Sequence, residues 1–289
     1  MRTWVRTFMA SRLWSSLVVL PVTRVARSAW RPQGITDGER VIPEETAVAF
    51  AYNGCFHAVM MATPQDLEDF ALGFSLTEHI VCAQEEIGRL EIIERDFGIE
   101  LRMGLSEPVA STLNERRRYL AGPTGYGLRG IETLAKALRL PPRVADGQIF
   151  TPAEIMRALE TFGPHQELNR QTRAVHAAGF WEPGAGLIVV REDVGRHNAL
   201  DKLGGALVCD RIPRQSGLIL VTGRVSAEMV QKAAVIGATV LIAASVPTGL
   251  AVRTAETAGI TLVAVARGDG FEIFTHPRRI SKDSVAYVA

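Results

Sequence analysis

The strongest constraint on the fold is the alternation of short apolar runs with helix-like segments in the second half of the chain. From about residue 174 onward, strand-like runs occur at "LIVVRED", "GLILVTG", "TVLIAAS", "TLVAVARG" and "FEIFT". Between them, helices are expected to begin at Asn198, at Ser226 and after Pro247-Thr248. Such alternation is typical of a sheet covered by helices. We therefore predict an α/β domain in this half.

A different pattern over roughly residues 30 to 105 predicts a smaller domain. The strand-like runs "TAVAFAY" and "CFHAVMM" flank Asn53-Gly54, a pair that supplies the positive φ angles of a tight hairpin turn. Thr63 is expected to cap a helix that starts at Pro64, with Asp66 completing the cap. Two more strand-like runs follow, "RLEIIER" and "GIELRMG", and then the helix-like "STLNERRRYLAG".

Length favours two domains, because 289 residues exceed the usual size of one hydrophobic core. We predict an N-terminal domain over residues 23–135, which includes the glycine-rich loop "GPTGYGLRG", and a C-terminal domain over 136–289. A helix capped by Thr151 and Glu154 is expected early in the second domain. Residues 1–22 are interpreted as a disordered extension or an over-long start rather than a signal peptide, because their apolar run is short.

Composition limits the classes of partner and compartment. The formal net charge is +1, so a nucleic acid is not expected as the main partner. No membrane partner is expected either, because no stretch approaches the roughly 20 apolar residues of a spanning helix. Cys55, Cys82 and Cys209 are far apart and show no metal-ligand spacing, which indicates a reducing compartment, the cytoplasm. None of the three has an evident activating partner, so each is interpreted as a packing residue.

The candidate binding site lies where the predicted strands of the second half end. Arg196, Arg224 and Arg267 each stand beside a glycine after such a strand. The planar guanidinium of arginine and the closely approaching backbone beside glycine can bind the same anion. Alternatively, each arginine is a solvated helix start and each glycine a turn. Recurrence after several strands favours a phosphorylated or nucleotide-like ligand, provided that the strands are neighbours.

Histidines and aspartates near the same strand ends leave several possibilities open. His176 and His197 could form a metal site or an acid-base pair, but neither has a ligand partner at recognisable spacing, so loop-fixing hydrogen bonds are favoured. Asp193 and Asp201 could pair with nearby basic residues, arginine above all, or accept hydrogen bonds from guanine. Pairing with arginine is slightly favoured.

The run "EDVGRHNALDKLGG" resembles the hallmark segment of the FdhD family of formate dehydrogenase accessory proteins. Four other segments agree in order, and the similarity spans roughly residues 23–276: "MMATPQDLEDFALGFSLTEHIV", "TGRVSAEMVQKAA", "VPTGLAV" and "TLVAVARGDGFEIFTH". The resemblance implies a small N-terminal domain and a three-layer domain similar to cytidine deaminase, in a cytoplasmic protein that is often dimeric. Members bind the bis-molybdopterin guanine dinucleotide form of molybdenum cofactor. They pass sulfur to it from a cysteine desulfurase before it enters formate dehydrogenase.

The same resemblance places the cofactor site. By position, the nucleotide-binding segment of the family falls on Val265, Ala266, Arg267, Gly268, Asp269 and Gly270. Arg196, His197, Asp201 and Arg224 complete the predicted cofactor site. Zinc is not expected, because the H-x-E and P-C-x-x-C elements of zinc deaminases have no counterpart around "VHAAG".

Three departures from the family pattern bear on activity. The loop that typically reads "TGCGLCG" has Tyr126 and Arg129 in place of the two sulfur-carrying cysteines, and neither side chain can hold a sulfane sulfur. Arg173 and Ala174 replace two glycines, and Thr222 replaces a serine. No catalytic residue is therefore assigned.

These departures favour a cofactor chaperone that aids maturation of the cofactor or its insertion into formate dehydrogenase. The alternative is an active sulfurtransferase that uses Cys55 or Cys82 near the loop. A weaker possibility is a nucleotide-binding protein with a different client.

Overall fold

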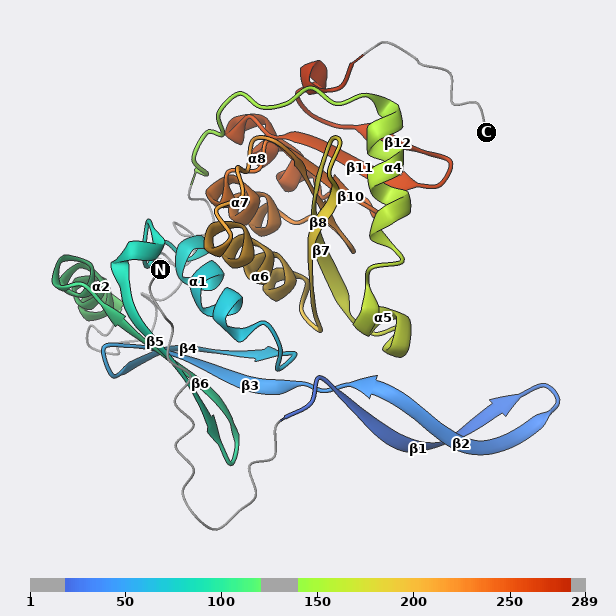
Figure 1. Ribbon diagram of the computed structural model, residues 1–289, viewed down its shortest axis with the longest axis horizontal. Helices are drawn as coiled ribbons and strands as arrows, with labels where there is room; N and C mark the ends of the chain where they lie inside the picture. The colour runs from blue at the N-terminus through green and yellow to red at the C-terminus, as the bar shows by residue number, and fades with distance from the viewer. Residues whose placement is uncertain (1–18, 121–139, 282–289) are drawn as a thin grey trace.

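The computed structural model describes residues 19–120 and 140–281, without the side chains of residues 114–120. It contains a six-stranded sheet, a four-stranded sheet and a two-stranded ribbon that projects from the body (Figure 1). The glycine-rich loop with Tyr126 and Arg129, most of the predicted extension over residues 1–22, and the predicted boundary between residues 135 and 136 lie outside the described residues.

The four-stranded sheet forms the core of the N-terminal half. Its strand order is β4-β3-β6-β5, and one face is covered by helix α1. The predicted hairpin is confirmed, because Asn53 and Gly54 have φ angles of 47° and 80°. The elements are β3 (Thr46–Tyr52), β4 (Cys55–Ala62), α1 (Leu67–Thr77), η1 (Gln84–Glu86), β5 (Ile87–Arg95), β6 (Gly98–Leu105) and α2 (Glu107–Leu120).

The predicted cap of α1 is wrong. The helix begins at Leu67, and Asp66 precedes it in a left-handed conformation without a side-chain cap. Thr63 cannot cap the helix because it is fully buried and is used elsewhere. Its N–H donates to Asp193 Oδ2 at 3.0 Å, and its hydroxyl accepts from the Val194 N–H at 3.1 Å.

The C-terminal half is a three-layer α/β domain. The alternation of strands and helices predicted its helix-covered sheet, and the family resemblance implied the three layers. Helices α6, α7 and α8 pack on one face of the six-stranded sheet, and α4 packs on the other (Figure 1). Every residue of β9 and β10 is buried, as expected for strands covered on both faces. The strand order is β12-β11-β10-β9-β7-β8. Its elements are α4 (Pro152–Phe162), α5 (Glu167–Thr172), β7 (His176–Glu182), β8 (Gly186–Asp193), α6 (Arg196–Cys209), β9 (Leu218–Val221), α7 (Ala227–Ile236), β10 (Val240–Ala243), α8 (Gly249–Ala258), β11 (Thr261–Arg267), β12 (Gly270–Ile273) and η2 (Pro277–Arg279).

Most of the predicted helix starts in this half are confirmed. Thr151 and Glu154 form the expected capping box of α4. Ser226 and Thr248 cap α7 and α8 with their side chains. Helix α6 begins at Arg196, two positions before the predicted Asn198. Strand β7, which forms an antiparallel hairpin with β8, was not predicted from the sequence.

The two halves meet where α1 crosses α6. Gly73 of α1 lies against the backbone of Asp201, and Gly205 of α6 lies against the backbone of Asp69. Any side chain at either position would separate the helices, so the close crossing requires glycine. Helix α6 thereby holds the N-terminal domain while its own first turn reaches the candidate site.

A ribbon of two long strands, β1 (Val22–Arg31) and β2 (Gly34–Pro43), was not predicted. We call it the arm. Figure 1 shows the arm projecting from the body beside α5. Near its base, Arg40 donates a hydrogen bond to the carbonyl of Thr172, at 3.4 Å between Nη2 and O. Most arm residues are exposed, so the period-2 hydrophobic pattern that marks a half-buried strand is weak.

Among the helices within residues 19–120 and 140–281, none has the length and apolar character required to cross a bilayer.

Candidate functional site

The polar strand ends predicted from sequence do lie along one edge of the six-stranded sheet. Strands β9, β10 and β11 are parallel neighbours, and β7 runs antiparallel beside β9, so its first residue, His176, lies at the same edge. Two backbone hydrogen bonds join successive loops: Thr248 N–H donates to Val225 O at 3.0 Å, and Val265 N–H donates to Ser245 O at 3.4 Å. We call this edge the rim.

Thr222 is the central residue of the rim. Its hydroxyl lies 3.1 Å from Nδ1 of His176 and accepts a hydrogen bond from the Ala177 N–H at 2.9 Å. Next to it, a Cβ atom added to Gly223 would lie 3.1 Å from the His176 ring and 3.8 Å from Cδ of Arg196. The loop after β9, the start of β7 and the start of α6 therefore meet at one point.

Both rim histidines have lowered pKa values, which favours their neutral form. Burial lowers the pKa of His176 below its ordinary 6.5, and the positive charge of Arg196 lowers it further. Burial also lowers the pKa of His197. The negative charge of Glu228, whose Oε2 lies 3.3 Å from Nε2 of His197, partly opposes this shift. Neutral imidazoles leave the Arg196 guanidinium as the positive charge beside them, and their ring nitrogens can bind ligand atoms.

These pKa shifts predict an acid-dependent loss of stability. A histidine with a lowered pKa in the folded state binds its proton more readily when unfolded, so the free energy of unfolding falls as pH drops through about 6.5. Urea denaturation measures the free energy of unfolding at neutral and at mildly acidic pH. The decrease between the two should be smaller for the double variant His176→Gln/His197→Gln than for the unmodified chain. The exposed His165, replaced by glutamine, serves as the control. Parallel pH profiles for all three proteins would contradict the assignment.

The predicted nucleotide-binding segment, residues 265–270, forms the far end of the rim. Val265 has a φ angle of 52°, which a β-branched residue adopts only under constraint, and the register of β11 and β12 shifts between Ala264 and Arg267. This bulge turns the chain so that Arg267, Gly268 and Asp269 are exposed, whereas Ala266 is buried. Strained backbone of this kind is often found at binding sites.

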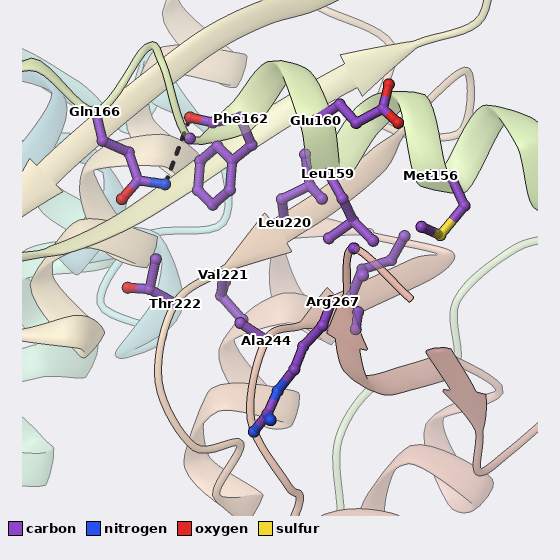
Figure 2. Close-up of a pocket in the computed structure, with 14 residues that line it drawn as sticks. Met156, Leu159, Glu160, Phe162, Gln166, Leu220, Val221, Thr222, Ala244 and Arg267 are labelled. Atoms are coloured by element: carbon purple, nitrogen blue, oxygen red, sulfur yellow. Dashed lines mark hydrogen bonds between the residues drawn. The ribbon is translucent and has the colours of Figure 1, made fainter. Parts of the chain in front are cut away.

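A pocket of about 240 Å³ lies between α4 and the rim (Figure 2). Its walls are mainly apolar, and its polar lining includes Thr222, Gln166 and Arg267. Figure 2 shows the Arg267 side chain extending away from α4. Thr222 belongs both to this pocket and to the cluster with His176 and Gly223. The pocket is lined by Met156, Leu159, Glu160, Phe162, Gly163, Gln166, Leu220, Val221, Thr222, Ile242, Ala244, Ala266, Arg267 and Gly268.

The predicted arginines differ in their environment. Arg196 is partly buried, and its Nε is a buried donor without a partner among the described residues. A buried donor left unpaired is costly, so a bound acceptor there would be stabilising. Arg224 is exposed in the loop after β9. Arg173, which replaces a glycine of the family pattern, adopts a left-handed φ of 59° just before β7.

Asp193 and Asp201 do not face the rim. Asp193 is fully buried and pairs with Lys202 at 2.7 Å, and Asp201 is 1% exposed with both oxygens 3.0 Å from Lys232 Nζ. The predicted pairing is thus with lysine rather than arginine. Because Asp201 is enclosed between α1, α6 and α7, we leave it out of the candidate site. The partners Thr63, Lys202 and Lys232 were missed, since nothing in their spacing shows that they meet.

The cysteines lie outside the pocket lining. Cys55 and Cys82 are exposed, while burial raises the pKa of the half-buried Cys209 to about 11. A thiol with that pKa is almost entirely protonated at neutral pH and is a poor nucleophile. Within the described parts of the chain, no group of three or more histidine, cysteine or carboxylate side chains is placed to hold a metal ion.

This chain is similar to known proteins over most of its length. Residues 43–281 match the model of the FdhD/NarQ family. A protein of Agrobacterium fabrum named sulfur carrier protein FdhD is 52% identical over 258 residues, which cover 89% of this chain and 95% of the relative. One of the same name from Cupriavidus necator is 46% identical over 259 residues, 90% of each chain. A crystal structure described as a formate dehydrogenase accessory protein from Desulfotalea psychrophila superposes with a TM-score of 0.71 at 28% identity, covering 90% of this chain and 99% of that one.

Proposed function

Because this chain belongs to the FdhD/NarQ family, we propose that it is a formate dehydrogenase accessory protein that binds the molybdenum cofactor along the rim. The cofactor is cargo, the bis-molybdopterin guanine dinucleotide form, which the protein holds for maturation or for insertion into formate dehydrogenase. The observation that carries the proposal is the double role of Thr222, which joins an apolar pocket to a cluster of cationic and neutral polar side chains.

The pocket suits one ring system of such a ligand. Its volume of about 240 Å³ is below the roughly 300–1,000 Å³ of pockets that enclose a whole drug-sized ligand. The apolar walls can cover the faces of a purine, and the side chains of Thr222 and Gln166 can bond its edge. We infer that the guanine base occupies the pocket, because it is a flat ring with donors and acceptors around its edge.

The arginines suit the phosphates. Arg267 borders the pocket, and Arg196 lies beside Gly223 on the other side of Thr222. Guanidinium groups bind phosphate oxygens in pairs, and the N-terminus of α7, which follows Arg224, adds the positive end of a helix dipole. The unpaired Nε of Arg196 supports this role, since a phosphate oxygen would supply the missing acceptor.

A nucleotide specificity experiment tests the site. GDP should protect the protein against thermal unfolding more than ADP does, by about 2–3 kcal/mol at a hundredfold excess over its Kd. Arg267→Ala should weaken this protection, while Arg157→Ala, an exposed arginine on α4, should leave it unchanged. Equal protection by GDP and ADP, or an unaffected Arg267→Ala variant, would refute the assignment of the rim.

The second candidate is an active sulfur carrier, and the names of the relatives favour it. A carrier needs an exposed thiolate that attacks the outer sulfur of a donor persulfide and displaces the donor thiolate. The carrier later passes that sulfur on by a second exchange. Cys55 and Cys82 meet the requirement of exposure, whereas the half-buried Cys209 does not. The positions that hold the sulfur-carrying cysteines in the family pattern are Tyr126 and Arg129 here, which favours the chaperone.

Sulfur loading separates the two candidates. The protein is incubated with a cysteine desulfurase and cysteine, treated with a persulfide-trapping reagent, and weighed intact by mass spectrometry. We expect no trapped persulfide. A stable persulfide at Cys55 or Cys82, lost in the corresponding Cys→Ser variant, would establish the sulfur carrier instead.

A further inference from the structure

The arm is a mostly exposed ribbon with an apolar end. Trp30 and Ile35 are paired across its two strands next to the turn, and their exposed fractions are 75% and 70%. Arg27 and Arg31 lie on the opposite face of the ribbon by register. An isolated two-stranded ribbon is at best marginally stable in water, and exposed tryptophan is uncommon without a partner. The arm thus has the features of a contact surface.

Charge is unevenly distributed between the arm region and the rest of the chain. The arm itself, residues 22–43, contains four arginines and two carboxylates, a formal charge of +2. With the residues before it, residues 1–43 contain seven arginines and two carboxylates, a formal charge of +5, whereas the whole chain carries +1 and the remainder therefore −4. No carboxylate precedes Asp37, and three of the four tryptophans, Trp4, Trp14 and Trp30, fall within this region. Such asymmetry indicates an anionic partner.

The combination of arginine and tryptophan favours one kind of anionic partner. Tryptophan partitions to the boundary between lipid headgroups and acyl chains, and basic side chains are attracted to anionic headgroups. We propose that the arm is a peripheral membrane contact, in which the Trp30 and Ile35 tip enters the headgroup region of an anionic bilayer. Its neighbouring arginines pair with lipid phosphates.

The shape of the arm fits this contact. Figure 1 shows the tip well separated from both sheets, so it can meet a flat surface without obstruction by the body. Such a contact needs no spanning helix. It is also distinct from the rim: the arm begins beside α5, and neither Trp30 nor Ile35 lines the pocket. Cofactor binding and membrane contact can therefore be tested separately.

Vesicle binding tests the proposal with the full chain and no added nucleotide. Phosphatidylcholine vesicles, with and without phosphatidylglycerol, are sedimented with the protein at low and high salt. We expect binding to the anionic vesicles only, weakened by salt. Trp30→Ser/Ile35→Ser should reduce it by about tenfold, and Arg27→Gln/Arg31→Gln by a similar factor. The matched control is Phe97→Ser, which replaces a 94% exposed aromatic residue in another hairpin turn.

Four results would overturn the proposal. The first is equal binding to neutral and anionic vesicles, or no binding to either. The second is vesicle binding by Trp30→Ser/Ile35→Ser that matches Phe97→Ser. The third is a loss confined to Trp4→Ser/Trp14→Ser, which would place the contact outside the arm. The fourth is a lower sedimentation mass of Trp30→Ser/Ile35→Ser without lipid, which would make the arm a contact between two copies of the chain. Unchanged melting temperatures would show that the variants fold.

Discussion

Replacing Lys202 with methionine is expected to destabilise the protein by about 3–5 kcal/mol, because it leaves the carboxylate of Asp193 buried without its counter-charge. The two side chains are 2.7 Å apart and neither has any exposed area. Lys202 Nζ also donates to the carbonyl of Thr63 at 2.9 Å, so the same change leaves a buried acceptor of the N-terminal domain without its partner. Urea denaturation measures the loss.

Two further variants distinguish a buried ion pair from simple packing. Asp193→Asn/Lys202→Met removes both charges and should cost less than the sum of the two single variants. Arg278→Met breaks an ion pair whose carboxylate, Asp146, is 94% exposed, and it should have little effect. Additive losses in the double variant would show that the charges are not coupled.

The same ion pair explains how the hallmark segment serves the rim. Asp193 Oδ1 accepts hydrogen bonds from the Gly195 N–H at 2.8 Å and from the Asn198 side chain at 2.9 Å, which fixes the turn between β8 and α6. Arg196 is the first residue of α6, directly after that turn. Several polar residues of "EDVGRHNALDKLGG" therefore join the domains and position one arginine. Only part of the segment is left to contact a ligand directly.

Local patterns predicted most of the fold. The Asn53-Gly54 turn and the caps at Thr151, Ser226 and Thr248 could be predicted because the residues that determine them are adjacent in sequence. The rim could be predicted for a related reason. Parallel strands end at one edge of a sheet, so polar residues after each strand lie along that edge, and those after neighbouring strands meet.

Contacts between the domains could not be predicted. Thr63 has the sequence context of a helix cap, yet its backbone and hydroxyl bind residues about 130 positions away. Asp201 follows the rim arginine by only five residues, but the helical turn directs it toward Lys232 and Thr77, away from the rim. Tertiary pairing overrides local preference at such positions.

Replacing Gly73 with alanine is expected to destabilise the protein by about 3 kcal/mol or more, because the added Cβ would lie 1.7 Å from the backbone oxygen of Asp201. The obstacle is backbone on a neighbouring helix, so relief requires α1 and α6 to move apart. Gly205→Ala should behave alike, with its Cβ 1.9 Å from the Asp69 oxygen.

Gly204→Ala is the matched control on the same helix, since its Cβ meets only the flexible side chain of Ile236, at 2.9 Å. Urea denaturation should therefore show the smallest loss of stability for Gly204→Ala. GDP should also protect that variant against thermal unfolding more than it protects the other two. The reason is that separation of α1 from α6 displaces the first turn of α6 and Arg196 with it. Equal losses for all three variants would mean that the helix crossing has no special need for glycine.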